Sequence, residues 1–354
     1  MAAGGLARRL PQRWYERRLA LALWPLLPLS LLFGALVGAR RWLYRCGLLR
    51  SHRLPVPVIV VGNLTVGGSG KTPLVLWLVA KLRARGWRPA IVSRGYGGRG
   101  DRGGSGARVL PVVATADCAV VGDEPLLLAR RSGVPVFVGR DRVAAARALL
   151  AAHPECNVIV ADDGLQHYRL QRSVELAVFD QRGVGNGWLL PAGPLREPLP
   201  RLSSVLAVVW NGRPEQALAG AARKLPQFAM RLRGQRFIAA SGEPRSCDAD
   251  ALRGRRLHAL AGIGDPSRFF RQLTALGLDF EAHPFPDHHR YRAGDLAFAE
   301  GAVVLMTEKD AVKCAALVTG EAWVLPVEAV IDTPPGGRAL FETILEKLHG
   351  RTPA

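Results

Sequence analysis

The sequence contains no closely spaced pair of cysteines. Its five cysteines are scattered along 354 residues, and no two of them form a C-x-x-C pair. An odd number of scattered cysteines argues against a disulfide framework and against a zinc site, and it fits a reducing compartment. We expect these side chains to act as small apolar fillers of the core.

Lysine is also scarce. Only six of the 48 basic residues are lysines, so arginine carries most of the net charge of +19. Such an excess suits a nucleic acid, an anionic lipid surface or a phosphorylated substrate. Helix-turn-helix patterns, aromatic-rich RNA motifs and zinc-ligand spacings are missing, and we therefore expect no nucleic-acid partner. Arginine enrichment can also follow from genomic base composition, so charge alone does not identify the partner.

The N-terminal region lacks a convincing signal-peptide cleavage site, although it has a long apolar run. Residues 19–39 are 21 residues without a charge, about 31 Å long as a helix. A span would place the five preceding arginines outside, against the positive-inside tendency, and Pro25 and Pro28 would kink it. An interfacial helix, in turn, usually has a polar face, which this run lacks. We expect membrane association, with a shallow or re-entrant insertion favoured over a single span.

The most informative motif follows an apolar stretch at residues 56–61. A glycine-rich run ending in Gly-Lys-Thr leads into a helix-like segment at 74–82. This layout cradles nucleotide phosphates, because backbone N–H groups and the helix N-terminus face the anionic oxygens. Lys71 would reach the β- and γ-phosphates, and Thr72 would offer its hydroxyl to Mg²⁺. The alternative is a glycine-rich turn that happens to contain a lysine. The expected cradle is Thr65, Val66, Gly67, Gly68, Ser69, Gly70, Lys71 and Thr72, with Thr65 where the general motif has its first glycine.

Apolar runs alternate with helical patterns from residue 56 onward. Short β-rich runs separated by helices imply a parallel sheet covered on both faces. After residue 224 strand-like runs appear at 228–232 and 237–239, and a second α/β unit follows with an apolar run at 257–261. The strands expected in the first sheet are 56–61, 89–93, 134–138, 158–161, 176–179 and 205–209, with helices at 124–132 and 142–152 between them.

Three acidic groups stand where phosphoryl-transfer chemistry would need them. Asp162 and Asp163 directly follow the strand 158–161, and a carboxylate at that position holds Mg²⁺ in many nucleotide sites. The alternative is an ordinary turn. Asp123 is either catalytic or only the N-cap of the next helix. Adjacent histidines in 285–291 suggest a metal, but no third ligand stands at metal spacing, and a solvent loop is the default.

Together the motifs resemble one family, the tetraacyldisaccharide 4′-kinases of lipid A biosynthesis. In that family a threonine in place of the first cradle glycine is not a departure. Its members are phosphotransferases with an alcohol acceptor, which use ATP and Mg²⁺ at the inner membrane to phosphorylate the 4′-position of a lipid disaccharide 1-phosphate. The matching segments are GNLTVGGSGKTP (62–73), SRGYGG (93–98), GDEP (122–125), ADDGLQH (161–167), PAGPLREP (191–198), FPDHH (285–289) and TEKDAVK (307–313).

The resemblance implies roles that spacing alone does not settle. Asp123 matches the base that receives the sugar hydroxyl proton, and His288 matches its partner. Lys71 matches the residue that stabilises the transferred charge, while Asp162 and Asp163 match the metal-associated pair, together with Thr72. Five further residues match the substrate region: Tyr96, Gln166, His167, Arg196 and Glu197. Without the resemblance, His167 would be a turn residue, Arg196 a surface charge and Tyr96 a loop filler.

The predicted fold is α/β, a P-loop NTPase-type parallel-sheet domain with an N-terminal membrane-associated helix and a second, smaller α/β domain. We expect the helix in 1–45, the kinase domain in 46–232, the smaller domain in 233–330 and a C-terminal helix in 331–354. Asp123 would then belong to the first domain and His288 to the second. We expect a monomer on the cytoplasmic face of the inner membrane, attached peripherally (monotopic) or by one N-terminal span. The alternative function is a membrane-associated P-loop ATPase that acts as a conformational switch.

Overall fold

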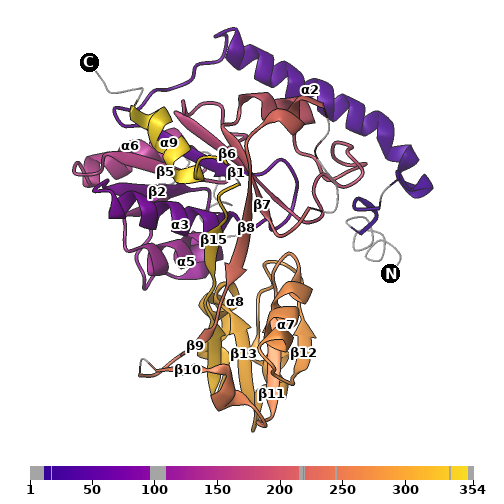
Figure 1. Cartoon of the computed structure of the whole chain (residues 1–354), viewed down its shortest axis with the longest axis vertical. Helices are drawn as coiled ribbons and strands as arrows, with labels where there is room; N and C mark the ends of the chain where they lie inside the picture. The colour runs from indigo at the N-terminus through magenta and orange to yellow at the C-terminus, as the bar shows by residue number, and fades with distance from the viewer. Residues whose placement is uncertain are drawn as a thin grey trace. The chain divides into compact units, whose positions relative to one another are not determined.

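The chain folds into two compact units. The computed structural model describes residues 12–16, 18–95, 109–214, 218, 220–243, 245–334 and 336–349 (Figure 1). Unit 1 holds the described residues of Met1–Ser93, Arg142–Arg231 and Ile331–Ala354. Unit 2 holds those of Arg94–Asp141 and Leu232–Val330.

Residues 94–141 differ from the sequence expectation, because they group with unit 2 rather than with the cradle. Helix α5 (Asp123–Ser132) packs on α8 (Glu308–Cys314) inside that unit. Arg131 and Glu308, which are 177 positions apart, form an ion pair between the two helices. Contacts over such a sequence distance leave no local pattern, so composition and spacing could not report them.

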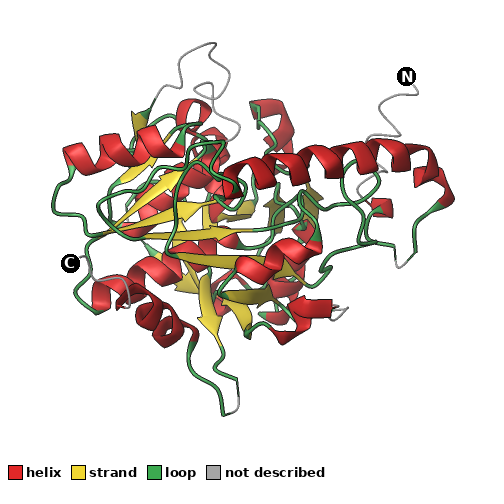
Figure 2. Cartoon of the chain, turned by 90° about the horizontal axis from the view of Figure 1, so that it is seen from above, coloured by secondary structure: helices red, strands yellow, loops and turns green. Residues whose placement is uncertain are grey.

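Unit 1 is built on six parallel strands. Their order is β8–β7–β6–β1–β5–β2, and every residue of β1, β2, β5, β6 and β7 is buried. Burial at every position requires cover on both faces, which explains why these strands are continuous apolar runs. The strands are β1 (Val58–Gly62), β2 (Pro89–Ser93), β5 (Val158–Asp162), β6 (Val174–Asp180), β7 (Ala207–Asn211) and β8 (Gln227–Arg233). Besides the N-terminal helix described below, the α-helices of this unit are α3 (Lys71–Ala84), α6 (Arg142–Ala152) and α9 (Leu340–His349). Figure 2 shows the strands of the molecule in yellow and its helices in red.

Unit 2 contains a six-stranded mixed sheet. β11, β12, β13 and β14 run parallel to one another. β9 pairs antiparallel with β14, and β10 pairs antiparallel with β9. Alternate residues of β11 face different cores: Leu257 and Ala259 pack with Phe237, whereas Leu260 packs with Val304. The sheet order is β10 (Ser246–Asp248), β9 (Arg236–Ala239), β14 (Ala322–Leu325), β13 (Val303–Thr307), β11 (Leu257–Ala261) and β12 (Glu281–Pro284), and helix α7 (Pro266–Ala275) follows β11.

The remaining elements are short. The strand expected at 134–138 is β4 (Val136–Val138), which pairs antiparallel with β3 (Leu110–Pro111). The C-terminal helix expected over 331–354 begins only at Leu340, the first residue of α9, because Ile331 ends strand β15 and a proline- and glycine-rich stretch at 333–337 precedes the helix. The others are β15 (Glu328–Ile331), α4 (Cys118–Val121) and the 3₁₀ helices η3 (Leu199–Ser204), η4 (Gly220–Lys224), η5 (Ala249–Leu252), η6 (Ala293–Ala299) and η7 (Ala315–Leu317).

The apolar N-terminal run forms η1 (Leu21–Leu26) and α2 (Leu27–Arg45), both in unit 1 (Figure 1). Within the described residues, Leu21–Arg45 is the stretch long and apolar enough to cross a membrane. Pro25 lies in the 3₁₀ turn and Pro28 in the first turn of α2, where a missing N–H costs little. The prolines therefore leave α2 itself uninterrupted. The predicted fold class, α/β with parallel sheets and an N-terminal apolar helix, is confirmed.

One face of α2 contacts the rest of unit 1 near both ends of the helix. The Ser30 hydroxyl donates to the Leu189 carbonyl and accepts from the Ala192 N–H, each at 2.9 Å. A Cβ on Gly34, one turn later, would lie 2.8 Å from the Leu189 side chain. Near the end of the helix the Tyr44 ring lies 5.7 Å from that of Tyr168. The polar contact of Ser30 thus lies buried near the start of an apolar helix.

Candidate functional site

The predicted cradle connects β1 to α3 in unit 1. Gly67 and Gly70 have positive φ angles of 99° and 91°, which glycine adopts without strain. A Cβ on Gly70 would also collide with Asn211, whose side-chain N–H donates to the Ser69 carbonyl at 3.1 Å. The Ser69 hydroxyl is buried and has no hydrogen-bond partner among the described residues. The loop therefore has the tight backbone of an anion-binding turn at a helix N-terminus.

Lys71 is held at the first turn of α3. Its ammonium donates to the Asn63 side-chain carbonyl at 3.3 Å and lies 3.6 Å from Asp163 Oδ1. Only 10% of its side chain is exposed. These contacts place the ammonium between the end of β1 and the carboxylate that follows β5.

Asp162 and Asp163 stand at the carboxyl end of β5, next to β1. Asp162 is buried and accepts from the Ser93 hydroxyl at 3.1 Å. Asp163 has a φ of 49° and meets the Arg196 guanidinium at 3.2 Å. Partial burial would raise the pKa of Asp163, but the charges of Lys71 and Arg196 hold it well below its ordinary value. Asp163 is therefore ionised at any physiological pH.

The donor chemistry of this end of the sheet fits a magnesium ion. Asp162 and Asp163 offer carboxylate oxygens, and Thr72 offers a hydroxyl in the first turn of α3. Mg²⁺ prefers hard oxygen ligands, and one or two carboxylates are its usual share from a protein. Thiols and imidazoles are not among these predicted ligands, so softer metals have no advantage here.

Gln166 and Arg196 link the cradle to the residues after β5. Arg196 donates to the Thr65 carbonyl and to the Gln166 side-chain oxygen, each at 3.2 Å. Gln166 in turn donates to the Asn63 carbonyl at 3.1 Å and to Glu197 at 3.0 Å. Arg196 is therefore a structural part of the cradle rather than a surface charge.

The segment that carries Arg196 is bonded to the cradle by its backbone as well. The Val66 N–H donates to the Pro194 carbonyl at 2.9 Å, and the Arg196 N–H donates to the Leu64 carbonyl at 2.6 Å. Glu197 is buried and accepts from the Tyr168 hydroxyl. His167 forms a turn, with its N–H on the Gly164 carbonyl at 3.0 Å. The expected site residue Tyr96 lies outside the described residues.

Asp123 and His288 meet in unit 2, although 165 positions separate them. His288 Nδ1 lies 3.0 Å from Asp123 Oδ2 and 3.2 Å from Oδ1. Asp123 begins α5, and its carboxylate also accepts from the Glu124 N–H at 2.9 Å. The structure thus brings together the two residues that the resemblance paired, and it places both in one unit.

Lys309 completes this cluster. Its ammonium lies 2.9 Å from Glu124, 3.0 Å from Asp287 and 3.9 Å from Asp123, and 3.4 Å from His288 Nε2. In the sequence Lys309 is one residue of the TEKDAVK segment, and its spacing indicates no role for it. The feature that could have indicated a role for Lys309 is its position. It lies on a helix that directly follows β13 and is capped by the Thr307 side chain.

The electrostatics of the cluster favour an ion pair. Burial would raise the pKa of Asp123, but the hydrogen bond with His288 and the charge of Lys309 lower it to about 2. The hydrogen bond with Asp123 raises the pKa of His288 above its ordinary value. His288 also has a φ of 58°, and it shares positive φ with Asp163 alone among the described non-glycine residues. Such strained backbone collects at functional sites.

Comparison with known proteins points to a single activity. A family model described as Tetraacyldisaccharide-1-P 4'-kinase matches residues 22–348. The chain is 58% identical over 355 residues to the tetraacyldisaccharide 4'-kinase of Azoarcus sp. (strain BH72), covering 100% of this chain and 99% of the relative. It is 57% identical over 348 residues to that of Dechloromonas aromatica (strain RCB), covering 98% and 99%.

A solved structure shares the fold. It is the "apo" form of LpxK from Aquifex aeolicus in complex with ATP, determined at 2.2 Å. The two chains match with a TM-score of 0.76 and 30% identity, over 93% of this chain and 100% of the other.

Proposed function

This chain belongs to the tetraacyldisaccharide-1-P 4′-kinase family, and from that premise we propose how its residues act. It transfers the γ-phosphate of ATP to the 4′-hydroxyl of a tetraacyldisaccharide 1-phosphate. The family resemblance inferred from the motifs, and with it the kinase activity, is confirmed. The alternative of a conformational-switch ATPase is not favoured, because the relatives are named as kinases.

The observation that carries the proposed chemistry is the position of Lys71. Its ammonium lies at the mouth of a glycine cradle between Asn63 and Asp163, where it would meet the β- and γ-phosphates. When bound, Mg²⁺ supplies further positive charge to those phosphates. Thr72, Asp162 and Asp163 are the residues that would hold the ion.

Asp123 and His288 act on the sugar hydroxyl. Since the pKa of Asp123 is about 2, the carboxylate stays ionised and orients the hydroxyl by accepting its hydrogen bond. Phosphoryl transfer passes through a loose transition state, so a weak base that removes the proton late is sufficient. His288 holds the carboxylate by its Nδ1, and Lys309 fixes both, because it contacts each of them.

Gln166, His167, Arg196 and Glu197 support the lipid substrate only indirectly in this proposal. Arg196 is bonded to Asp163 and to the Thr65 carbonyl. Glu197 is buried among its partners. These side chains hold the shape of the cradle. Other side chains, at the surface of the cradle, contact the disaccharide directly.

The N-terminal helix attaches the kinase to the cytoplasmic face of the inner membrane without crossing it. A span needs about 30 Å of helix surrounded by lipid, whereas α2 contacts the rest of unit 1 at Ser30 and Gly34 near its start and at Tyr44 near its end. The opposite stripe is Leu29, Leu32 and Leu36, which are 54%, 58% and 61% exposed. Such a stripe lies in the interface with its apolar face in the acyl region. This attachment needs one copy of the chain, so we propose a monomer.

The decisive experiment follows the labelled phosphate. Purified protein is incubated with Mg-ATP labelled at the γ-position and with tetraacyldisaccharide 1-phosphate in detergent micelles. We expect label in the lipid in proportion to the ADP formed. Label released only to water would support the conformational-switch ATPase and would contradict the proposed transfer.

A further inference from the structure

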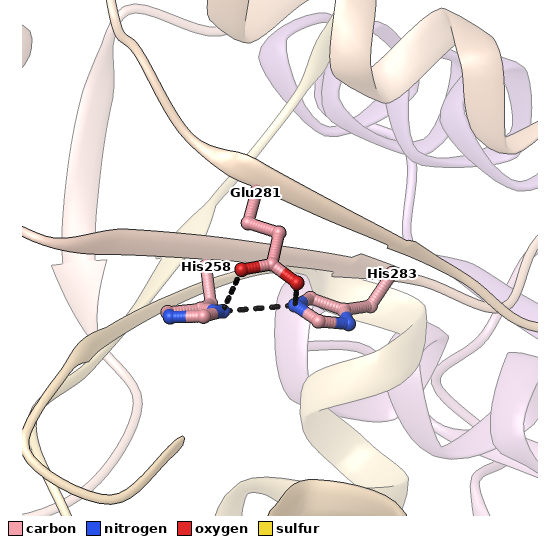
Figure 3. Close-up of side chains that lie close together, drawn as sticks. All are labelled: His258, Glu281 and His283. Atoms are coloured by element: carbon pink, nitrogen blue, oxygen red, sulfur yellow. Dashed lines mark hydrogen bonds and ion pairs between the residues drawn. The ribbon is translucent and has the colours of Figure 1, made fainter. Parts of the chain in front are cut away.

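Three side chains in unit 2 converge at the edge of its sheet, away from the residues used above. They are His258 on β11 and Glu281 and His283 on β12 (Figure 3). Their donor atoms all lie within 4.8 Å of one another. His258 Nδ1 is 2.9 Å from His283 Nε2, and each of these nitrogens is 3.7 Å from an oxygen of Glu281.

The strand register brings these three residues to one face. β11 and β12 are parallel with His258 opposite Glu281, so both side chains lie on the same side of the sheet. His283 is two residues after Glu281, and the period of two returns it to that side. β12 is the edge strand, which leaves Glu281 68% exposed while His258 is only 3% exposed. A small ion can therefore reach the cluster from solvent.

We propose that His258, Glu281 and His283 bind a divalent transition metal, with zinc as the natural candidate. Zinc lies about 2.0–2.2 Å from imidazole nitrogens and carboxylate oxygens, so the ligands of one tetrahedral ion are about 3.3–3.6 Å apart. The two nitrogens are 2.9 Å apart and need to separate by only about 0.4 Å to reach this range. The exposed Glu281 side chain can rotate to shorten its separation of 3.7 Å. Two histidines and one glutamate, with water in a fourth position, form a usual zinc ligand set.

The surroundings hold the imidazoles in place. The Phe298 ring stacks on His283 at 3.7 Å with an interplanar angle of 4°, and it lies 5.4 Å from the ring of His258. Packing that fixes the ring planes reduces the ordering that metal binding must impose. The competing explanation is a hydrogen bond between two neutral imidazoles, in which a proton takes the place of the ion. That explanation assigns no role to the Glu281 carboxylate, which points toward both nitrogens in Figure 3.

Metal bound here would stiffen the segment that carries His288. It would clamp β11 to β12 near their amino ends. The Phe285 N–H then continues the ladder by donating to the Ala261 carbonyl at 2.8 Å, and His288 follows three residues later. The site would be structural, because its ligands lie on β11 and β12 and do not contact the Asp123–His288 pair.

The test measures zinc binding to the metal-stripped full chain by isothermal titration calorimetry, in a buffer with excess Mg²⁺ to occupy oxygen-only sites. Wild-type protein should bind one Zn²⁺ and melt at a higher temperature with it, since binding to the folded state stabilises that state. Glu281→Gln keeps the size of a mostly exposed side chain and should weaken zinc binding at least 10-fold, the least that loss of a supporting ligand partner costs. His283→Gln should do the same and should abolish the zinc-dependent melting shift.

His153→Gln is the matched control, because His153 pairs with Glu155 in an exposed part of unit 1. It should bind Zn²⁺ like the wild type. Cobalt absorption in the visible range provides a second readout, since imidazole ligation changes the spectrum even if a variant melts early. The proposal is overturned if the wild type binds no stoichiometric zinc, or if Glu281→Gln binds it as tightly as the wild type. In the first case the imidazoles form only a hydrogen bond.

Discussion

The pairing of Asp123 with His288 makes a quantitative prediction for a double-mutant cycle. We expect Asp123→Ala and His288→Ala each to lower kcat by at least about 10²-fold, the lower range for a positioned acid or base. If the two side chains act as one unit on the hydroxyl, the double variant should lose clearly less than the product of the two single losses. ATP binding should remain nearly intact in all three, because none of them alters the cradle.

The size of the coupling follows from the carboxylate. Its pKa falls from 3.8 to about 2, which corresponds to about 2.5 kcal/mol in favour of the ionised form. The hydrogen bond with His288 is the largest of the causes that lower this pKa, and a hydrogen bond to a charged group contributes about 1.5–3 kcal/mol. The double variant should therefore be about 10–150-fold more active than the product of the single losses.

The coupling should also depend on pH. The lowered pKa of Asp123 means that its contribution is present above the ordinary carboxyl pKa and is lost only as the pH falls toward about 2. The raised pKa of His288 means that its contribution is complete below the ordinary histidine value and is lost as the pH rises through the raised value. The coupling measured at about pH 6 should thus exceed that at about pH 9.

Steady-state transfer to the micellar lipid provides the assay, and circular dichroism checks that each variant is folded. The matched control is His289→Ala, since His289 is the neighbouring histidine and pairs with Asp295 instead. It should show no coupling with Asp123→Ala. Losses that multiply in the double variant, at both pH values, would refute the reasoning, and full turnover in Asp123→Ala would return the base role to Asp162 or Asp163.

Three further changes test other parts of the molecule. Lys71→Ala should lower turnover by about 10³-fold or more, because it removes a charge from the transferring phosphoryl group. Leu32→Glu combined with Leu36→Glu should release the protein from anionic vesicles in a flotation assay, because charge on the exposed stripe of α2 opposes burial in the interface. Lys309→Met should lower the free energy of unfolding by about 3 kcal/mol in urea titrations, because it leaves the buried Asp123 and two half-buried carboxylates without their cation.

Each of these changes has a control of the same type. Lys81→Ala alters an exposed lysine of the same helix α3 and should keep full turnover. Val113→Glu adds a charge at another exposed apolar position and should leave vesicle binding unchanged. Lys347→Met changes an exposed lysine on α9 and should not move the urea midpoint. Near-normal turnover in Lys71→Ala, vesicle binding by the doubly charged helix, or an unaltered midpoint in Lys309→Met would contradict the respective assignment.

The cradle could be predicted from the sequence because its determinants are local. An apolar run, a glycine-rich loop and a helix follow one another within residues 56–82, and each has its own backbone preference. The position of Asp162 and Asp163 could also be predicted, since carboxyl ends of parallel strands share one edge of a sheet. What the pattern could not contain is the Asn211 side chain beneath Gly70, which comes from a strand about 140 residues later.

The cluster around Lys309 could not be predicted from the sequence either, because its residues are distant from one another in the chain. Its partners Asp123, Glu124 and Asp287 come from two distant segments, and only the tertiary fold places them around one ammonium. Residues 94–141 were likewise assigned to the first domain by sequence proximity alone. The burial of α5 against α8 follows from long-range packing, which periodicity does not encode.

The hydroxyl of Ser30 has a practical consequence for anyone who wishes to work with a detergent-free version of this kinase. It occupies both the Leu189 carbonyl and the Ala192 N–H, in the segment whose Pro194 carbonyl holds the Val66 N–H of the phosphate loop. Cutting off the helix therefore removes the partner of the Ala192 N–H and leaves the Leu189 carbonyl with the Gly193 N–H alone, at 2.9 Å. Both groups lie a few residues from the nucleotide site. Replacing the outward-facing leucines by polar residues, while retaining Ser30 and Gly34, would give soluble protein. In that protein α2 would still hold the segment whose Pro194 carbonyl accepts from the phosphate loop.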